Sequence, residues 1–355
     1  MNELELPPLQ TGPDAWLGPD VARRQDWILE LGPTELAELE AAAAPHVAAG
    51  ETATDALAGL DPASFPLPSL GPRLSSLREE LLHGRGFFLM RGLPVGTYSR
   101  LQTAAIFLGV GAHLGRARSQ NAKGHILGHV FDLGLSGADP NVRIYQTSQR
   151  QTFHTDSCDV VGLLCLQEAK RGGDSQLVSA LAIYNTMLSD CPQLLARLLA
   201  PMPHDRRGEV PAGMKPWFEI PVYSWIDEQL TVFYQRQYFD SAQRFPEARR
   251  LSAEDRLALD RFDALADDAR LHLSMRLLPG DMQFVHNHNL LHDRTAFEDW
   301  PEPDRKRHLL RLWLACPGAR PLPESFAARY GSVEIGNRGG ITVPGTRLHV
   351  PLVPE

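Results

Sequence analysis

The spacing of apolar side chains is helical in the first third of the chain and strand-like after about residue 125. Residues 33–49 begin with Pro-Thr and are rich in strong helix formers, which predicts a helix. Residues 71–86 carry leucines at helical spacing and end in glycine, so they predict a second helix. The run GFFLMRGL at 86–93 predicts a buried strand, and residues 97–115 return to a helical pattern.

Short apolar segments rich in Val, Ile and Leu dominate the remainder. They predict strands at 125–133, 141–148, 160–169, 175–179, 271–288 (two strands about a Pro-Gly-Asp turn) and 306–316. Residues 215–239 contain two aromatic and β-branched arms around IDEQ, which predicts one hairpin. Helices are expected at 180–199 and at 252–271, where Ser252 is the predicted cap.

Many short strands with inserted helices predict a mostly β protein with a helical coat. The expected core is a jelly roll or barrel, because alternating βαβ units are not evident. We divide the chain into a helical accessory segment, residues 1–85, and a β domain, residues 86–355 with inserted helices. The sequence contains no glycine-rich phosphate loop of the GxxxxGK[ST] or GxGxxG kind.

Composition narrows the class of protein. With 43% apolar and 22% charged residues, the chain has the make-up of a globular protein. Its net charge of −8 argues against nucleic acid and anionic membranes as partners. No apolar run approaches the roughly 18–20 residues that span a bilayer. The four cysteines lack a CxxC spacing and no signal peptide is evident, so we expect a cytoplasmic protein.

The stretch QTFHTDSCDV, residues 151–160, contains the first candidate chemistry. His154 and Asp156 are two positions apart, and side chains at i and i+2 of a strand share one face. Such a pair is a weak signal alone, but a non-haem Fe(II) site needs two imidazoles and one carboxylate. A third ligand must come from elsewhere, and three histidines lie together downstream: His286, His288 and His292.

Two arginines and a serine add to this pattern. Arg307 and Arg311 are four positions apart on the predicted last strand, so both should face one side. A buried guanidinium there needs an anion, which the far carboxylate of 2-oxoglutarate would supply. Ser175 follows a Gly-Gly-Asp turn and could donate a hydrogen bond to the same carboxylate.

The segments FHTDSCDVVGLLCLQEAKRGGDSQLVSA, LLPGDMQFVHNHNLLHDRTAF and RHLLRLWL together resemble the Fe(II)/2-oxoglutarate-dependent dioxygenases of the taurine dioxygenase-like (clavaminate synthase-like) superfamily. The resemblance covers about residues 86–320. It implies a double-stranded β-helix core with a helical coat. It also implies O2 and a small organic molecule as substrates, with release of succinate and CO2.

Carried over by motif, the resemblance implies iron ligands, 2-oxoglutarate contacts and substrate contacts. The implied iron ligands are His154, Asp156 and His292. Arg307 would bind 2-oxoglutarate, and Ser175 stands where the family has threonine. The resemblance also makes Arg311 and Asn287 candidate substrate contacts. Arg150, four positions before His154, is a further candidate from its place in the sequence.

The same residues also allow alternative ligands or purely structural roles. His286 or His288 could replace His292 as the ligand, since a slip of one residue turns a strand over. Arg311 could be an internal ion-pair partner, for example of Asp159. Arg150 could be a plain arginine at a strand edge.

Three functions remain open from the sequence. The first is an oxygenase that hydroxylates an unactivated C–H bond in a biosynthetic tailoring step on an amino acid or natural-product scaffold. The second is a catabolic dioxygenase whose small anionic, sulfonate-like substrate is held by Arg311. The third is a non-catalytic jelly-roll protein that binds a metal or small ligand. The carboxylate of Asp156 favours hydroxylation, desaturation or cyclisation over halogenation, which in relatives needs that position open.

Overall fold

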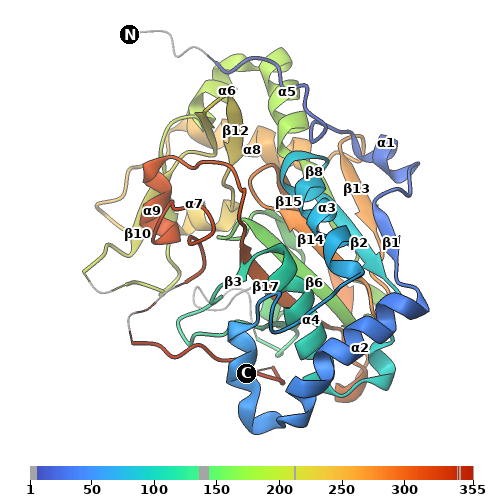
Figure 1. Cartoon of the computed structure of the whole chain (residues 1–355). Coiled ribbons are helices and arrows are strands. Elements are labelled where there is room, and N and C mark those ends of the chain that lie inside the picture. The colour runs from blue at the N-terminus through green and yellow to red at the C-terminus, as the bar shows by residue number, and fades with distance from the viewer. Residues whose placement is uncertain (1–5, 136–143, 212, 342, 344, 355) are drawn as a thin grey trace.

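The computed structural model describes residues 6–135, 144–211, 213–341, 343 and 345–354. Two antiparallel-type sheets face each other and helices cover their outer sides (Figure 1). The larger sheet has the strand order β1-β2-β14-β6-β17-β3, and β4 also pairs with β17. Its strands are β1 (Ile28–Glu30), β2 (Phe87–Arg91), β3 (Arg116–Ala117), β4 (Gly128–Phe131), β6 (Val160–Gln167), β14 (Met282–His286) and β17 (His308–Ala315).

The smaller sheet has the order β13-β8-β15-β5. Its strands are β5 (Gln151–His154), β8 (Ser175–Ser179), β13 (His272–Met275) and β15 (Leu290–Arg294). One apolar cluster joins side chains of both sheets, including Val161 and Val285 of the larger and Leu177 and Leu273 of the smaller. Two facing sheets that share one core form the double-stranded β-helix, so the predicted fold is confirmed.

Strand β2 explains why its sequence is apolar at every position. Phe87 and Leu89 pack into the cluster between the sheets, whereas Phe88 and Met90 pack against the helices. Because alternate side chains point to opposite faces, a strand covered on both sides must be apolar throughout. The same division holds along β6, where Val161 faces inward and its neighbours face the helices.

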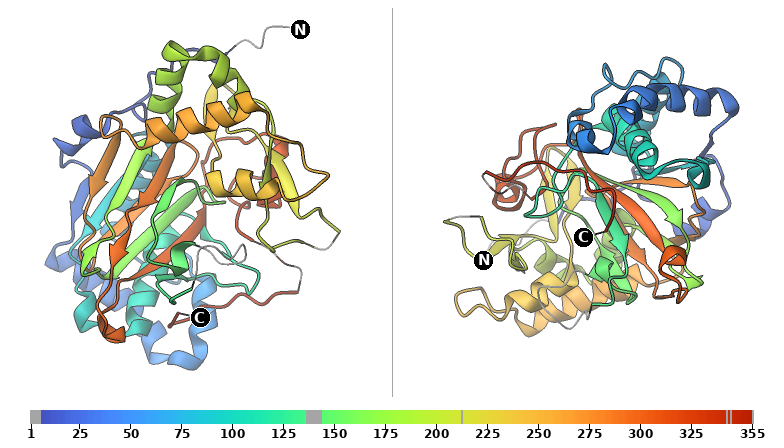
Figure 2. Two further views of the ribbon diagram at one scale, coloured as in Figure 1. Left: turned by 180° about the vertical axis from the view of Figure 1, so that it is seen from behind. Right: turned by 90° about the horizontal axis from the view of Figure 1, so that it is seen from below.

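Helices cover both outer faces of the sheets. In the right view of Figure 2, the blue N-terminal helices lie on one side of the strands and the orange α8 lies on the other. The apolar clusters place α2, α3 and α4 against the larger sheet and α5, α6 and α8 against the smaller. The helices are α1 (Gly18–Ala22), α2 (Pro33–Ala48), α3 (Leu70–His83), α4 (Arg100–Leu114), α5 (Ala180–Asp190), α6 (Pro192–Leu198), α7 (Arg236–Ala242), α8 (Ala253–Ala266) and α9 (Ala327–Tyr330).

One local prediction was wrong and another was right only in part. In the described part of 141–148, residues Ile144–Gln146 form a 3-10 turn in place of a strand. In 215–239, only β11 (Tyr223–Ile226) and β12 (Gln229–Val232) form the expected hairpin. The first arm also supplies β10 (Trp217–Ile220), which pairs with β9 (Met202–Asp205), and the second arm continues into α7. The remaining strands, β7 (Arg171–Gly172) and β16 (Phe297–Glu298), pair with each other.

The N-terminal segment is joined to the β domain by backbone pairing as well as packing. Strand β1 pairs in parallel with β2, and the Trp16 ring lies against Phe87 with centroids 5.7 Å apart. We keep as a proposal that residues 1–85 form an accessory segment on the domain of 86–355. Among the described residues, no helix is long and apolar enough to cross a membrane.

Candidate metal centre

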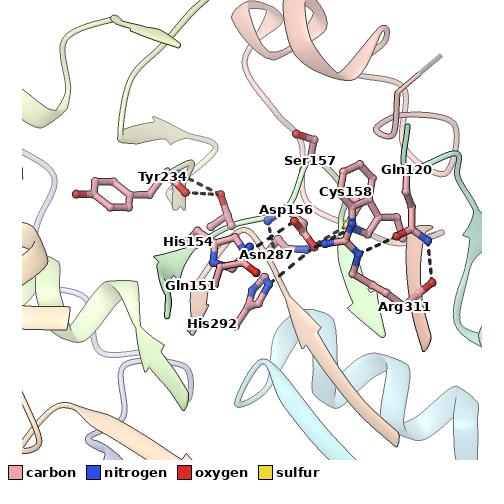
Figure 3. Close-up of polar contacts among 12 residues, drawn as sticks. Gln120, Gln151, His154, Asp156, Ser157, Cys158, Tyr234, Asn287, His292 and Arg311 are labelled. Atoms are coloured by element: carbon pink, nitrogen blue, oxygen red, sulfur yellow. Dashed lines mark hydrogen bonds and ion pairs between the residues drawn. The ribbon is translucent and has the colours of Figure 1, made fainter. Parts of the chain in front are cut away.

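Sheet register brings two histidines together. His154 is the last residue of β5, and its direct cross-strand partner is His292 in β15. Because opposed residues of an antiparallel pair point to the same face, the imidazole rings meet with centroids 4.1 Å apart. Asp156 lies in the loop after β5 and turns its carboxylate toward both rings (Figure 3).

These three side chains form the one candidate metal cluster found in the described part of the chain. One ligand atom from each lies within 4.8 Å of the others, and all three residues are buried. His154 Nδ1 is 2.9 Å from the carbonyl oxygen of Thr152, which places the proton on Nδ1 and leaves the lone pair that can bind a metal on Nε2. In this structure Nε2 accepts from the Gln151 side-chain amide at 2.9 Å, a contact that a bound metal would replace. Burial lowers the pKa of His154, and lowers that of His292 to about 3, so both rings are neutral. Two neutral imidazoles and one carboxylate are the donor set that suits non-haem Fe(II).

Asp156 is held by several groups besides the histidines. Trp313 Nε1 donates to its Oδ2 at 2.7 Å, and Arg311 Nη1 lies 3.4 Å from the same oxygen. Its backbone N–H donates to Oδ1 of Asn287 at 3.0 Å. Burial alone would raise the pKa of Asp156, but the neighbouring Arg311 charge, together with the hydrogen bond from Trp313, holds it below its usual value. The carboxylate is therefore ionised and oriented before a metal arrives.

Arg311 is held in place by contacts with other protein side chains. Its Nε donates to Oε1 of Gln120 at 2.8 Å, and its guanidinium lies over the rings of Tyr145 and Trp313, 4.6 and 5.1 Å from their centroids. Arg311 also contacts Asp156. These contacts agree with the alternative in which Arg311 is an internal ion-pair partner.

The acid that contacts Arg311 is Asp156, so Asp159 is not its partner. Asp159 contacts His288 Nε2 at 2.9 Å, Arg338 Nε at 2.8 Å and the backbone N–H of Cys316 at 2.9 Å. This fully buried network fixes the start of β6 and the end of β17 next to the metal centre. His286 and His288 are buried outside the metal cluster, so His292 is the histidine that joins His154 and Asp156.

A pocket of about 40 Å³ lies against both metal-site histidines and reaches Arg307 and Ser175. Arg307 is 5% exposed, and its Nη2 donates to the carbonyl of Gly173 at 3.2 Å. In the described part of the chain it has no ion pair, and burial lowers its pKa to about 10. Such a guanidinium needs an anion to offset its desolvation. Ser175 Oγ donates to Oε1 of Gln283 at 3.0 Å, so its hydroxyl would have to rotate to reach a ligand.

The other two predicted substrate contacts are engaged with protein groups. Arg150 is ion-paired with Asp293 and Asp267, at 2.6 Å each, and does not line the pocket. Asn287 is fully buried, and its Nδ2 contacts Cys158 Sγ at 3.2 Å while its oxygen holds the backbone of Asp156.

Sequence reasoning missed Trp313, Gln120 and Arg294. Trp313 could have been found, because it is two positions after Arg311 on a strand and so shares its face. Gln120 lies in a loop with no pattern to reveal it. Arg294 lines the same pocket as Arg307, and burial together with the Arg307 charge lowers its pKa to about 9.

Comparison with known proteins places the chain in a family. Residues 53–313 match the family model described as taurine catabolism dioxygenase TauD, TfdA family. The chain belongs to this family. It is therefore a 2-oxoglutarate-dependent non-haem iron dioxygenase that uses Fe(II) and 2-oxoglutarate, as the donor set indicates.

Individual relatives agree with this assignment. The chain is 34% identical over 330 residues to FR-33289 synthase of Streptomyces rubellomurinus, covering 90% of this chain and 95% of that protein. It is 30% identical over 308 residues to taurine hydroxylase-like protein SAT17 of Stachybotrys chartarum, covering 84% and 77% respectively. The fold matches the structure of asparagine oxygenase in complex with Fe(II), 2S,3S-3-hydroxyasparagine and succinate. That match has a TM-score of 0.61 at 18% identity and covers 81% of this chain and 93% of the other.

Proposed function

We propose that this enzyme hydroxylates an unactivated C–H bond of a small organic molecule in a biosynthetic tailoring step on an amino acid or natural-product scaffold, releasing succinate and CO2. The observation that carries the proposal is the buried cluster of His154, Asp156 and His292 beside a pocket that contains the buried guanidinium of Arg307. The similarity to FR-33289 synthase supports a biosynthetic role.

In the proposed arrangement, His154, Asp156 and His292 hold Fe(II), which when bound supplies the activation of O2. Arg307 binds the far carboxylate of 2-oxoglutarate, because it is buried in the pocket beside the two histidines. Ser175 lies in the same pocket, and its hydroxyl, once turned away from Gln283, would donate to the same carboxylate. The protein orients these groups and excludes bulk water from the centre.

The catabolic alternative, with a sulfonate-like substrate on Arg311, has less support. Arg311 contacts Asp156 and Gln120, so an anion bound there would compete with the metal-site carboxylate for one guanidinium. The non-catalytic alternative does not fit membership of a dioxygenase family.

The first test is anaerobic addition of Fe(II) and 2-oxoglutarate to the purified chain. We expect the weak visible charge-transfer band of the chelate in the wild type and its loss in Asp156→Ala. Asp304→Ala removes an exposed carboxylate outside the site and should keep the band. If the metal-loaded wild type showed no band, the assignment of these three residues as ligands would be wrong.

The second test concerns the reaction. Candidate amino acids and natural-product scaffolds are incubated with the loaded enzyme, and products are analysed by mass spectrometry. We expect a product heavier by one oxygen atom, formed in step with succinate. A product that has lost two hydrogens would point instead to desaturation or cyclisation at the same centre.

A further inference from the structure

Strand register places a second arginine beside the proposed 2-oxoglutarate site. Arg294 lies in β15 two positions after His292, so the two side chains point to the same face of the strand. Its direct cross-strand partner in β8 is Ser175, whose hydroxyl is assigned above to the far carboxylate of 2-oxoglutarate. Opposed residues of an antiparallel pair point to one face, with Cβ atoms about 4.5–5.5 Å apart. The Arg294 side chain therefore starts next to the proposed position of that carboxylate.

The pocket beside the metal centre is lined by Arg294 and Arg307 together. Arg294 is 7% exposed and Arg307 is 5% exposed. Both guanidinium groups lie against the ring of Phe297, with their central carbons 4.6 and 5.3 Å from its centroid. Two like charges are thus buried near one aromatic side chain, which is costly unless an anion lies with them.

No acid of the described part of the chain forms an ion pair with either of these two guanidinium groups. The described lining of the pocket contains one acid, Asp293, and that carboxylate is ion-paired with Arg150 at 2.6 Å. The third arginine of the pocket, Arg311, contacts Asp156. The two buried charges near the phenylalanine ring are therefore the ones that a bound anion would compensate.

Arg294 is held by backbone groups that leave one of its donors unused. Its Nη1 donates to the carbonyl of Thr147 at 3.0 Å, and its Nη2 donates to the carbonyl of Gln149. Its Nε is buried and has no hydrogen-bond partner among the described residues. A buried donor without an acceptor costs free energy, which a ligand that accepts from it would recover. The guanidinium is thus fixed in place while its Nε–H and its charge remain for an anion.

We propose that Arg294 is a second cationic contact for the far carboxylate of 2-oxoglutarate, and that it makes the enzyme select 2-oxo acids that end in an anion. The proposal rests on the iron site and the role of Arg307 in the proposed function, and it adds a specificity-determining residue to them. A carboxylate offers two oxygens with about four lone-pair sites, so it can accept from two guanidinium groups and from Ser175 at once.

The test compares 2-oxoglutarate with 2-oxopentanoate, which keeps the 2-oxo acid end but has a methyl group in place of the far carboxylate. Each is titrated anaerobically into the Fe(II)-loaded protein, and the visible chelate band reports its Kd. The wild type should bind 2-oxoglutarate more tightly. In Arg294→Gln, the Kd for 2-oxoglutarate should rise about tenfold and that for 2-oxopentanoate should change by less than about twofold, since only the first ligand loses a charge-assisted contact. Arg270→Gln removes a charge whose side chain is 88% exposed, and as the matched control it should behave as the wild type does.

A purely structural role of Arg294 predicts a different result. Loss of the contacts to Thr147 and Gln149 would weaken both ligands alike, so an equal rise of the two Kd values overturns the proposal, as does an unchanged Kd for 2-oxoglutarate. Equal affinity of the wild type for the two ligands would contradict a far-carboxylate contact by either arginine. A wild type without a chelate band would instead contradict the iron site of the proposed function.

A second measurement needs only the wild type and Arg294→Lys, in case the glutamine variant does not fold. Zn(II), which is diamagnetic, replaces iron in protein labelled with ¹⁵N-arginine, and the Nε–H signal that is absent from Arg294→Lys belongs to Arg294. This signal should shift when 2-oxoglutarate is added and stay in place with 2-oxopentanoate, because only the first ligand brings an acceptor to Nε. A signal that responds to both ligands equally, or to neither, overturns the proposal.

Discussion

At the scale of single residues, the metal centre depends on groups that do not bind metal. The indole of Trp313 and the guanidinium of Arg311 both contact Oδ2 of Asp156, and Asn287 holds its backbone. Such supporting groups orient ligands and commonly change metal affinity about 10–100-fold when removed. In this chain the carboxylate is oriented by an aromatic N–H that no motif names.

We predict that Trp313→Phe weakens Fe(II) binding about tenfold or more, because the ring remains but its hydrogen bond to Asp156 is lost. Metal titration followed by the anaerobic chelate band measures the change. Trp300→Phe, at a half-buried loop position outside the site, is the control and should bind as the wild type does. Equal affinities for the two variants would contradict an orienting role.

Arg307→Gln should raise the apparent Kd for 2-oxoglutarate by about tenfold or more, since a buried charge-assisted contact is replaced by a neutral one. Titration of 2-oxoglutarate into the metal-loaded protein measures this. Metal affinity without 2-oxoglutarate should be unchanged, and a fall in both would indicate structural damage instead.

At the scale of elements, the sequence predicted which segments form buried strands, but it did not predict which strands pair with each other. The run FFLMR predicted β2, because a strand covered on both faces must be apolar throughout. The hairpin within 215–239 is shorter than predicted, because β10 pairs with β9. Strand β9 ends twelve positions before β10 begins, and no local signal selects it as the partner. Short-range spacing fixes element type, whereas pairing depends on tertiary contacts.

The residues of the site fall into the same two groups, those that a sequence pattern predicts and those that only the fold brings together. His154, Asp156, His292 and Arg307 belong to a motif with fixed spacing. Gln120, which holds Arg311, comes from a loop, and no periodicity marks it. Sequence reasoning could locate the candidate metal ligands but could not locate the loop residue that positions Arg311 beside them.

The pair β9–β10 should make stability depend on pH through His204. This fully buried ring stacks on Phe218 and lies at a tilt against Phe239, and burial lowers its pKa from 6.5 to about 3. Above pH 6.5 the ring is neutral in both states. As pH falls below 6.5, protons bind the unfolded chain first, so stability drops by about 1.4 kcal/mol per pH unit until pH approaches 3. Urea unfolding at pH 7 and pH 5 should show a smaller loss for His204→Leu than for the wild type.

Helix α8 offers a separate test of local stability. Ser252 Oγ accepts from the Asp255 N–H at 3.1 Å, and the Asp255 carboxylate accepts from the Ser252 N–H at 3.0 Å. Ser252→Ala should reduce the free energy of unfolding by about 1 kcal/mol. Chemical denaturation measures this, and the anaerobic chelate band should be unchanged because α8 covers the outer face of the smaller sheet.

At the scale of the whole molecule, the two sheets and their helical covers form the frame around the metal centre. The charge clusters at the site are local, since the chain as a whole is acidic with a net charge of −8. The net charge therefore disfavours a negatively charged co-substrate, and in the proposed arrangement Arg307 compensates that charge locally.

Metal and 2-oxoglutarate should stabilise the folded chain. A ligand present at a hundred times its Kd adds about 2.7 kcal/mol when it binds the native state alone. Addition of Fe(II) and 2-oxoglutarate under anaerobic conditions should raise the melting temperature, and a chelator should reverse the rise. Asp156→Ala should show no rise, and an equal rise in that variant would mean that stabilisation arises elsewhere.

The cross-strand pairing of His154 with His292 has a consequence for assembly of the enzyme. The two imidazoles face each other because β5 and β15 are in register, and a shift of one residue would turn one ring to the opposite face. During synthesis His292 emerges long after His154 and Asp156, so the chain holds an incomplete set of ligands until its last strands have been made. Iron loading is thus a late event that reports correct closure of the smaller sheet, and a misregistered chain would remain without metal.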